Sequence, residues 1–218
     1  MSKRLTVVIS TIFGLALLGL GVAASIQFKS HRAEPELATS FIFPTAKKLA
    51  PFSLKDQHGN LFSNSQLADK WSLFFIGYTS CPDVCPTTMG KLSAAYPELL
   101  KDIDLQIIFL SVDPQRDTQE KLLAYMDFFN PEFTAITGEH AQLFPLTRDL
   151  GFVYAMVGEG ENYQVDHSAS MALISPEGRK VAIIKPKSST PGTLPQILTK
   201  NLISDIGKIV SIQRQNTK

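Results

Sequence analysis

A short apolar run, Trp71–Gly77 (WSLFFIG), leads into Cys81-Pro82-Asp83-Val84-Cys85-Pro86, which holds the only two cysteines in the sequence. An unbroken apolar run of this length is typical of a buried central strand. Pro86 suits the first turn of a helix, where its missing N–H costs no hydrogen bond. A strand, a cysteine loop and a helix in this order indicate an α/β sheet whose site lies beyond the carboxyl end of the strand.

The segments around this unit predict the other elements. Short strands flank the turn at residues 56–60 and form an N-terminal hairpin. Strands and helices then alternate: a helix at Thr87–Leu100, a strand at Leu105–Val112, a helix opening with the capping-box sequence Asp117-Thr118-Gln119-Glu120, a strand at Phe133–Thr137, and a helix at Glu139–Leu150 interrupted near Pro145. A hairpin of residues 170–175 and 180–184 and an amphipathic helix from Leu194 to Ile209 follow. This order predicts a thioredoxin-like α/β fold with a central mixed sheet flanked by helices.

The N-terminal region predicts a membrane anchor. Residues 5–28 carry no charged side chain, and as a helix they would be about 36 Å long, against a hydrocarbon core of about 30 Å. Lys3 and Arg4 precede this run, which favours a cytoplasmic N-terminus and a single-pass protein of a bacterial inner membrane with its domain in the periplasm. The alternative is a cleaved signal peptide, with Gly21-Val22-Ala23 as the small-residue site.

The chain is therefore expected to divide into four parts. Residues 1–4 form a cytoplasmic N-terminus, 5–28 a transmembrane helix, 29–50 a linker and 51–218 the thioredoxin-like domain. With 21 basic and 20 acidic side chains the formal net charge is +1, and no basic stripe stands out. This balance argues against nucleic acid as a partner.

The cysteines and one distant histidine suggest a metal site. Two thiols and an imidazole, from Cys81, Cys85 and His167, are a ligand set that suits a soft ion such as Cu(I). Cys85 is expected near the start of the helix, where the partial positive charge favours the thiolate. Asp166 could orient the ring of His167. Sequence spacing alone does not make His167 a ligand.

These residues give the chain a family resemblance. It resembles the Sco/SenC copper proteins, which are membrane-anchored thioredoxin-like domains that help to assemble the copper centre of cytochrome c oxidase. The resemblance rests on three stretches: residues 77–86 (GYTSCPDVCP), residues 111–118 (SVDPQRDT), and residues 166–168 (DHS) leading into residues 173–178 (LISPEG). They follow one another in order between about residue 50 and residue 185.

The resemblance implies a function and a set of site residues. It implies that Cys81, Cys85 and His167 hold Cu(I), with Cu(II) as a second candidate, and that Asp83 and Asp113 have supporting roles. The implied partners are the copper-accepting subunit of cytochrome c oxidase and an upstream copper donor. On this interpretation the protein is a copper chaperone that delivers copper to the oxidase or prepares the cysteines of its copper centre.

Other interpretations of the same residues stay open. The cysteines could be the catalytic pair of a thiol–disulfide oxidoreductase, for which His167 would be dispensable, so whether the protein is an enzyme is left undecided. A structural disulfide would gain little from closing so short a loop, and a structural zinc site would need a fourth ligand such as Asp83 or Asp166. A peroxiredoxin-like peroxidase would need a cationic group beside the thiolate, and Arg116 is the nearest downstream arginine. Met89 and Met171 are expected in the core.

Overall fold

The computed structural model of this chain describes residues 13–21, 36–160, 163–188 and 195–216. The chain divides into two units, Met1–Glu36 and Leu37–Lys218. In the first unit residues 13–21 form a helix, and most of the expected anchor, residues 5–28, lies outside the described residues. None of the helices in the described part has both the length and the apolar character needed to cross a bilayer.

The second unit is built on one eight-stranded mixed sheet, in the order β1-β10-β9-β4-β5-β6-β2-β3. The strands are β1 (Ser40–Lys48), β2 (Ser53–Asp56), β3 (Leu61–Ser63), β4 (Trp71–Gly77), β5 (Leu105–Ser111), β6 (Thr134–Thr137), β9 (Met171–Ile174) and β10 (Arg179–Ile184). β4, β5 and β6 are parallel, and every other neighbouring pair is antiparallel. This confirms the predicted mixed sheet with parallel central strands.

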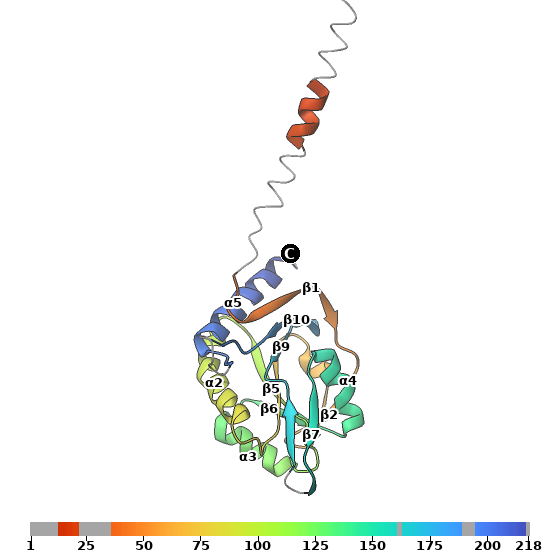
Figure 1. Cartoon of the computed structure of the whole chain (residues 1–218), viewed down its shortest axis with the longest axis vertical. Coiled ribbons are helices and arrows are strands. Elements are labelled where there is room, and N and C mark those ends of the chain that lie inside the picture. The colour runs from red at the N-terminus through yellow and green to blue at the C-terminus, as the bar shows by residue number, and fades with distance from the viewer. Residues whose placement is uncertain (1–12, 22–35, 161–162, 189–194, 217–218) are drawn as a thin grey trace, which may run out of the picture. The chain divides into compact units, whose positions relative to one another are not determined.

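Helices cover both faces of the sheet. The structure has the short 3-10 helix η1 (Asn64–Leu67) and the α-helices α2 (Val84–Leu99), α3 (Gln119–Phe129), α4 (His140–Leu150) and α5 (Thr199–Asn216). One core cluster joins the sheet to α2, α3 and α5 through Met89, Leu122 and Leu202, and a second joins it to α4 through Leu143. Figure 1 shows α2, α3 and α5 on one side of the strands and α4 on the other. β4 is buried along its whole length between these layers.

The predicted linker is wrong for its second half, because residues 40–48 form strand β1. β1 pairs antiparallel with β10, but its register shifts between Ile42 and Lys47, where Pro44 lies. Such a bulge breaks the two-residue alternation that identifies a strand in a sequence. The bulge therefore explains why this segment shows no sustained period.

Three helix predictions need correction. α2 begins at Val84 with Asp83 as its N-cap, so Cys85 lies inside the first turn. α4 runs through Pro145 without interruption, because a single proline removes one helical hydrogen bond and adjoining turns can retain theirs. α5 starts at Thr199, later than the expected Leu194.

The capping box expected at residues 117–120 is absent. The N-cap of α3 is Thr118, whose hydroxyl accepts a hydrogen bond from the N–H of Lys121. Asp117 is buried and bonds instead to groups in other segments. A carboxylate near a helix start can serve a distant loop as well as the helix, and the sequence pattern is the same in both cases.

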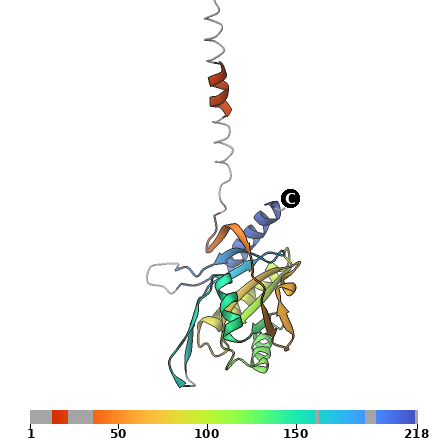
Figure 2. The same cartoon turned by 90° about the vertical axis from the view of Figure 1, so that its right-hand side faces the viewer.

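One hairpin was not predicted. β7 (Tyr154–Val157) and β8 (Gln164–His167) pair antiparallel in a two-stranded sheet separate from the main one. Figure 2 shows this hairpin, in teal, running down one side of the domain. His167 is therefore the last residue of a strand, where the sequence suggested a loop.

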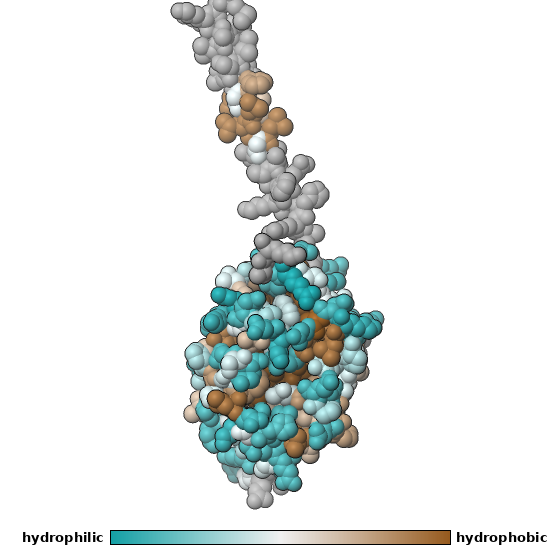
Figure 3. Space-filling view, turned by 180° about the vertical axis from the view of Figure 1, so that it is seen from behind, coloured by the Kyte–Doolittle hydropathy of each residue, from teal (hydrophilic) through white to brown (hydrophobic). Residues whose placement is uncertain are grey.

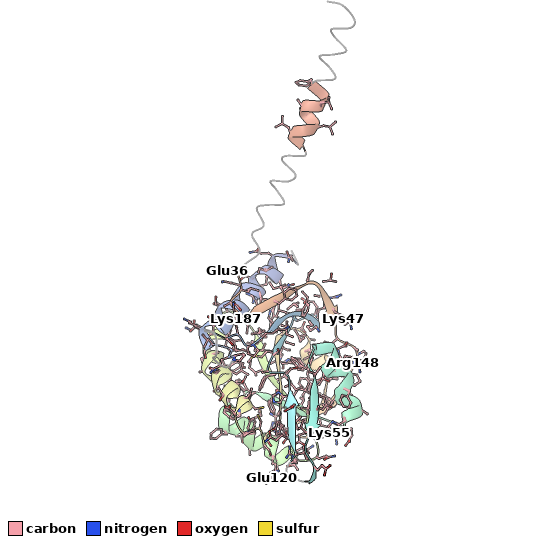
Figure 4. The ribbon with its side chains drawn as sticks, viewed as in Figure 1. Glu36, Lys47, Lys55, Glu120, Arg148 and Lys187 are labelled. Atoms are coloured by element: carbon pink, nitrogen blue, oxygen red, sulfur yellow. The ribbon has the colours of Figure 1, made fainter. Side chains whose placement is uncertain are left out.

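The outer surface of the second unit is mostly polar in the view of Figure 3, with smaller apolar areas between the polar ones. Figure 4 labels exposed charged side chains of both signs on this unit: Lys47, Lys55, Glu120, Arg148 and Lys187. They come from β1, β2, α3, α4 and the segment after β10. These charges are spread over the fold and do not gather on a single element.

Candidate metal centre

The cysteine loop begins where β4 ends. The N–H of Cys81 donates to the carbonyl of Tyr78 at 3.2 Å, which turns the chain back after the strand. Cys85 is fully buried, and its N–H donates to Sγ of Cys81 at 3.4 Å. A Cβ placed on Gly77 would lie 2.7 Å from Sγ of Cys85. Glycine at the end of β4 thus leaves the space in which the buried sulfur lies.

The histidine comes from the hairpin. Because side chains alternate along a strand, His167 and Val165 face the domain while Gln164 and Asp166 face solvent. Nε2 of His167 lies 3.3 Å from Sγ of Cys85, and its Nδ1 lies 3.0 Å from the carbonyl oxygen of Ser168. A carbonyl oxygen can only accept, so Nδ1 carries the proton and the lone pair of a neutral ring lies on Nε2.

The expected role of Asp166 in orienting the ring is wrong. Asp166 is exposed on the opposite face of β8, and the carbonyl of Ser168 takes the place of the expected carboxylate. The rings of Phe75 and Tyr78 also meet the imidazole edge-on, with centroids at 6.4 Å and 6.0 Å. A backbone group and two aromatic rings therefore hold His167 in place.

The three side chains converge. One ligand atom each from Cys81, Cys85 and His167 lies within 4.8 Å of the other two, and among the described residues these form the one such group of three or more His, Cys, Asp or Glu side chains. Both cysteines are free thiols. Their role as metal ligands stays a prediction, and so do the supporting roles of Asp83 and Asp113.

The two cysteines differ in their ionisation. A hydrogen bond from Cys85 lowers the pKa of Cys81 to about 4; burial opposes this, while His167 and the backbone N–H groups of Asp83 and Cys85 add to it. The interaction with Cys81, together with burial, raises the pKa of Cys85. The thiolate is therefore Cys81, and Cys85 is the neutral donor beside it. This corrects the expectation that the helix start would favour a thiolate at Cys85, because burial and a neighbouring thiolate outweigh the helix end.

The expected supporting residues lie around this group. Asp83 is exposed, and what it offers to Cys81 is its backbone N–H. Asp113 is fully buried and forms an ion pair with Arg116, Nε to Oδ2 at 2.5 Å. Met89 and Met171 are in the core, as predicted. Two sulfurs and one imidazole nitrogen fit a soft ion of low coordination number such as Cu(I), since a structural zinc site would call for a fourth ligand.

The comparison with known families agrees with this chemistry. The SCO1/SenC family model matches residues 43–202. The chain belongs to the SCO1/SenC family. Among its relatives, a SCO2-like protein of Rickettsia prowazekii is 35% identical over 168 residues, which cover 75% of this chain and 82% of the relative.

Solved structures of Sco proteins share the fold. The structure of Arabidopsis thaliana ScoI with copper bound superposes with a TM-score of 0.65 at 30% identity and covers 74% of this chain and 97% of its own. Yeast Sco1 with copper bound gives a TM-score of 0.64 at 28% identity, over 76% of this chain and 89% of its own. The family resemblance and the α/β fold expected from the sequence are therefore confirmed.

Sequence reasoning missed the residues that support the centre. Asp117 accepts hydrogen bonds from Thr79 and Ser111, and Tyr163 contacts Asp113 and Arg116. Five of these six residues fall within the SCO1/SenC-like stretches at residues 77–86 and 111–118, which was the available signal, and of the six only Asp113 was expected to have a supporting role. Tyr163 lies in none of these stretches, so only the structure identifies it.

Proposed function

We propose that this SCO1/SenC protein binds one Cu(I) ion through Cys81, Cys85 and His167 and passes it to the copper-accepting subunit of cytochrome c oxidase. The observation that carries the proposal is the convergence of two sulfurs and an imidazole nitrogen within 4.8 Å. Two solved relatives have copper bound. Another solved relative, BsSco, is described as a member of the Sco family of cytochrome c oxidase assembly proteins.

Loading and release of copper follow from the ionisation of the site. Cys81 offers a thiolate and His167 a lone pair on Nε2, while Cys85 must give up its proton as the ion binds. Cys81 is partly exposed, so an incoming thiolate of the partner can reach the ion from that side and exchange with the protein ligands one at a time. Oxidation of the Cys81 thiolate and the Cys85 thiol to a disulfide, by an oxidant that accepts the two electrons, releases one proton, removes both sulfur ligands and prevents binding.

A second candidate function is thiol–disulfide exchange with the cysteines of the oxidase subunit. The partly exposed Cys81, with its lowered pKa, has the character of an attacking thiolate, and the buried Cys85 that of a resolving thiol. In this function His167 is dispensable. The reduction potential of the pair decides whether it can reduce a partner, because about 30 mV corresponds to about 1.4 kcal/mol.

The proposed cellular setting is a bacterial inner membrane, with a single N-terminal anchor and the domain in the periplasm, where an upstream copper donor would load it. The uncharged run at residues 5–28, preceded by Lys3 and Arg4, supports this setting. If the run is an anchor, the full chain stays with membranes after alkaline extraction. A full chain that is released into the soluble fraction would contradict the anchor.

Anaerobic titration of the full chain in detergent with Cu(I), against a competing chelator, tests copper binding. We expect one tight equivalent for the reduced protein, none for the oxidised protein, and an affinity at least about tenfold weaker for His167→Ala. His58→Ala, which alters an exposed histidine in the β2–β3 turn, is the matched control and should bind as the wild type does. If none of the reduced proteins binds Cu(I) tightly, the proposed copper transfer is wrong, and thiol–disulfide exchange remains as the candidate function. If His167→Ala binds as tightly as the wild type, the three-ligand site is wrong.

A further inference from the structure

The hairpin that carries His167 lies outside the main sheet. β7 and β8 pair with each other, and neither belongs to the eight-stranded sheet. Within the hairpin, the N–H of Ser168 donates to the carbonyl of Val153 at 3.0 Å. Among the described residues, no hydrogen bond of the main sheet holds His167, so side-chain contacts between the hairpin and the rest of the domain contribute to its position relative to the cysteines.

One group of these contacts is formed by Tyr163, directly before β8. Its hydroxyl donates to Oδ1 of Asp113, and its carbonyl accepts from Nη1 of Arg116 at 2.8 Å. The guanidinium of Arg116 also lies over the Tyr163 ring, 3.7 Å from the centroid. Asp113 and Arg116 form an ion pair with each other, so Tyr163 is held by two hydrogen bonds and a cation–π contact to two side chains that are themselves joined.

Tyr163 and His167 are four residues apart on the same extended segment. Alternation places Tyr163, Val165 and His167 on one face, and Val165 between them is buried against the domain. The backbone N–H of Val165 also bonds to the hydroxyl of Tyr78, the residue that follows β4. A displacement at Tyr163 would thus be carried along a short strand to the imidazole.

The segment that forms hydrogen bonds with Tyr163 also forms hydrogen bonds with the cysteine loop. Asp113, Arg116 and Asp117 belong to residues 111–118, which run from the last residue of β5 to the start of α3. Asp117 accepts hydrogen bonds from the backbone and the hydroxyl of Thr79, just before Cys81. We call residues 111–118 the bridging loop, because it contacts both segments that supply the candidate ligands.

We propose that Tyr163 is a positioning residue: through Asp113 and Arg116 of the bridging loop, it fixes the strand that carries His167 and so holds the imidazole beside the cysteines. The inference rests on the proposed function for its copper readout. In this proposal the bridging loop keeps the imidazole of His167 at a fixed position relative to the two sulfurs. Without this contact the cysteines still bind Cu(I), but the imidazole joins them less often.

A double-mutant cycle tests the proposal. Cu(I) affinity is measured by chelator competition for the full chain as wild type, Tyr163→Phe, His167→Ala and the double variant. We expect Tyr163→Phe to weaken binding about tenfold in the wild type and to change nothing in the His167→Ala background, since its effect passes through the imidazole. X-ray absorption of the copper-loaded Tyr163→Phe protein should show a smaller imidazole contribution and the same sulfur contribution.

Tyr96→Phe is the matched control. It removes another tyrosine hydroxyl, one that donates to the carbonyl of Leu105 at 3.2 Å, and should leave Cu(I) affinity unchanged. An equal loss in both backgrounds would mean that Tyr163→Phe acts by general destabilisation, and would overturn the proposal. A Tyr163→Phe protein that binds Cu(I) as tightly as the wild type would also overturn the proposal. If His167→Ala still weakened Cu(I) binding in that case, the proposed function would stand.

Amide exchange in the metal-free protein decides the proposal even if copper binding fails. The N–H of Ser168, hydrogen-bonded across the hairpin, should exchange at least about fivefold faster in Tyr163→Phe than in the wild type and Tyr96→Phe. Unchanged exchange would overturn the positioning role. Loss of copper binding by the wild type itself would refute the proposed function and not the positioning of the hairpin.

Discussion

The carboxylate of Asp117 accepts two hydrogen bonds from Thr79, one from the backbone N–H at 3.0 Å and one from the hydroxyl at 2.6 Å. Its Oδ2 also accepts from the hydroxyl of Ser111 at 2.6 Å. Burial raises the pKa of Asp117, and these hydrogen bonds oppose that rise. A buried carboxylate therefore ties the start of the cysteine loop to the end of β5.

Replacing Asp117 with alanine should loosen the cysteine loop. The change leaves the N–H of Thr79 and the hydroxyl of Ser111 without their acceptor, which costs about 1–3 kcal/mol of stability. Urea unfolding measures the loss, and Cu(I) affinity should fall with it. Asp166→Ala, at an exposed position on β8, is the control and should change stability by less than about 0.5 kcal/mol. Equal stability of the two variants would contradict the role of Asp117.

Gly77→Ala should disturb the site directly. The new Cβ would lie 2.7 Å from Sγ of Cys85 and 2.8 Å from a ring carbon of Phe109, so the sulfur or the ring must move. We expect a loss of about 1–3 kcal/mol in stability and weaker Cu(I) binding. Gly90→Ala on α2 has no such neighbour within 4 Å and should instead stabilise the protein by about 0.5–1 kcal/mol. Thermal unfolding of both variants checks the opposite signs.

The two cysteines should differ in reactivity in the reduced, metal-free protein. Because the pKa of Cys81 is about 4, its alkylation by iodoacetamide should be nearly independent of pH between about 6 and 8. Cys85→Ala removes the largest cause of that low pKa, so the rate at Cys81 should then rise with pH over the same range. Mass spectrometry of the modified peptides locates the label. Faster modification of Cys85 than of Cys81 in the wild type would contradict this assignment.

The parts that the sequence predicted well are those with a local cause. Residues 71–77 are a continuous apolar run, which is how a strand buried on both faces reads. The β9–β10 hairpin has a turn at Gly178, whose φ of 70° suits glycine. The three candidate ligands were found from residue chemistry and a family resemblance, and the fold brings them together.

The parts that the sequence did not predict depend on distant partners. β8 is only four residues long and pairs with a strand outside the main sheet, so its alternation is too short to read. Asp166 adjoins His167 in sequence, yet a strand turns neighbours to opposite faces. Asp117 matches a local helix-capping pattern, whereas its actual partner Thr79 lies 38 residues earlier in the sequence. Hydrogen bonds between segments this far apart leave no local pattern.

Asp205 should make the stability of the domain depend on pH in the acid range. Burial raises its pKa, but hydrogen bonds from the N–H groups of Ala38 and Thr39 and the hydroxyl of Ser40 outweigh burial, so the net pKa is lowered. A carboxyl group whose pKa is lower in the folded state contributes its full stabilisation of the fold at pH values above its unfolded pKa of about 3.9. That stabilisation is lost as the pH falls through the folded value.

Asp205→Asn tests this contribution. The variant keeps the size of the side chain but places an NH₂ group among donors, so it should lose about 1–3 kcal/mol of stability at pH 7. The difference from the wild type should begin to shrink as the pH falls below the unfolded pKa of about 3.9 and should approach zero only below the lower folded pKa, where the wild-type carboxyl is protonated in the folded state as well. Urea unfolding at pH 7 and at about pH 3 measures both values, with Asp166→Asn as the exposed control. A difference of the same size at both pH values would show that the charge of Asp205 is not what joins α5 to the chain entering β1.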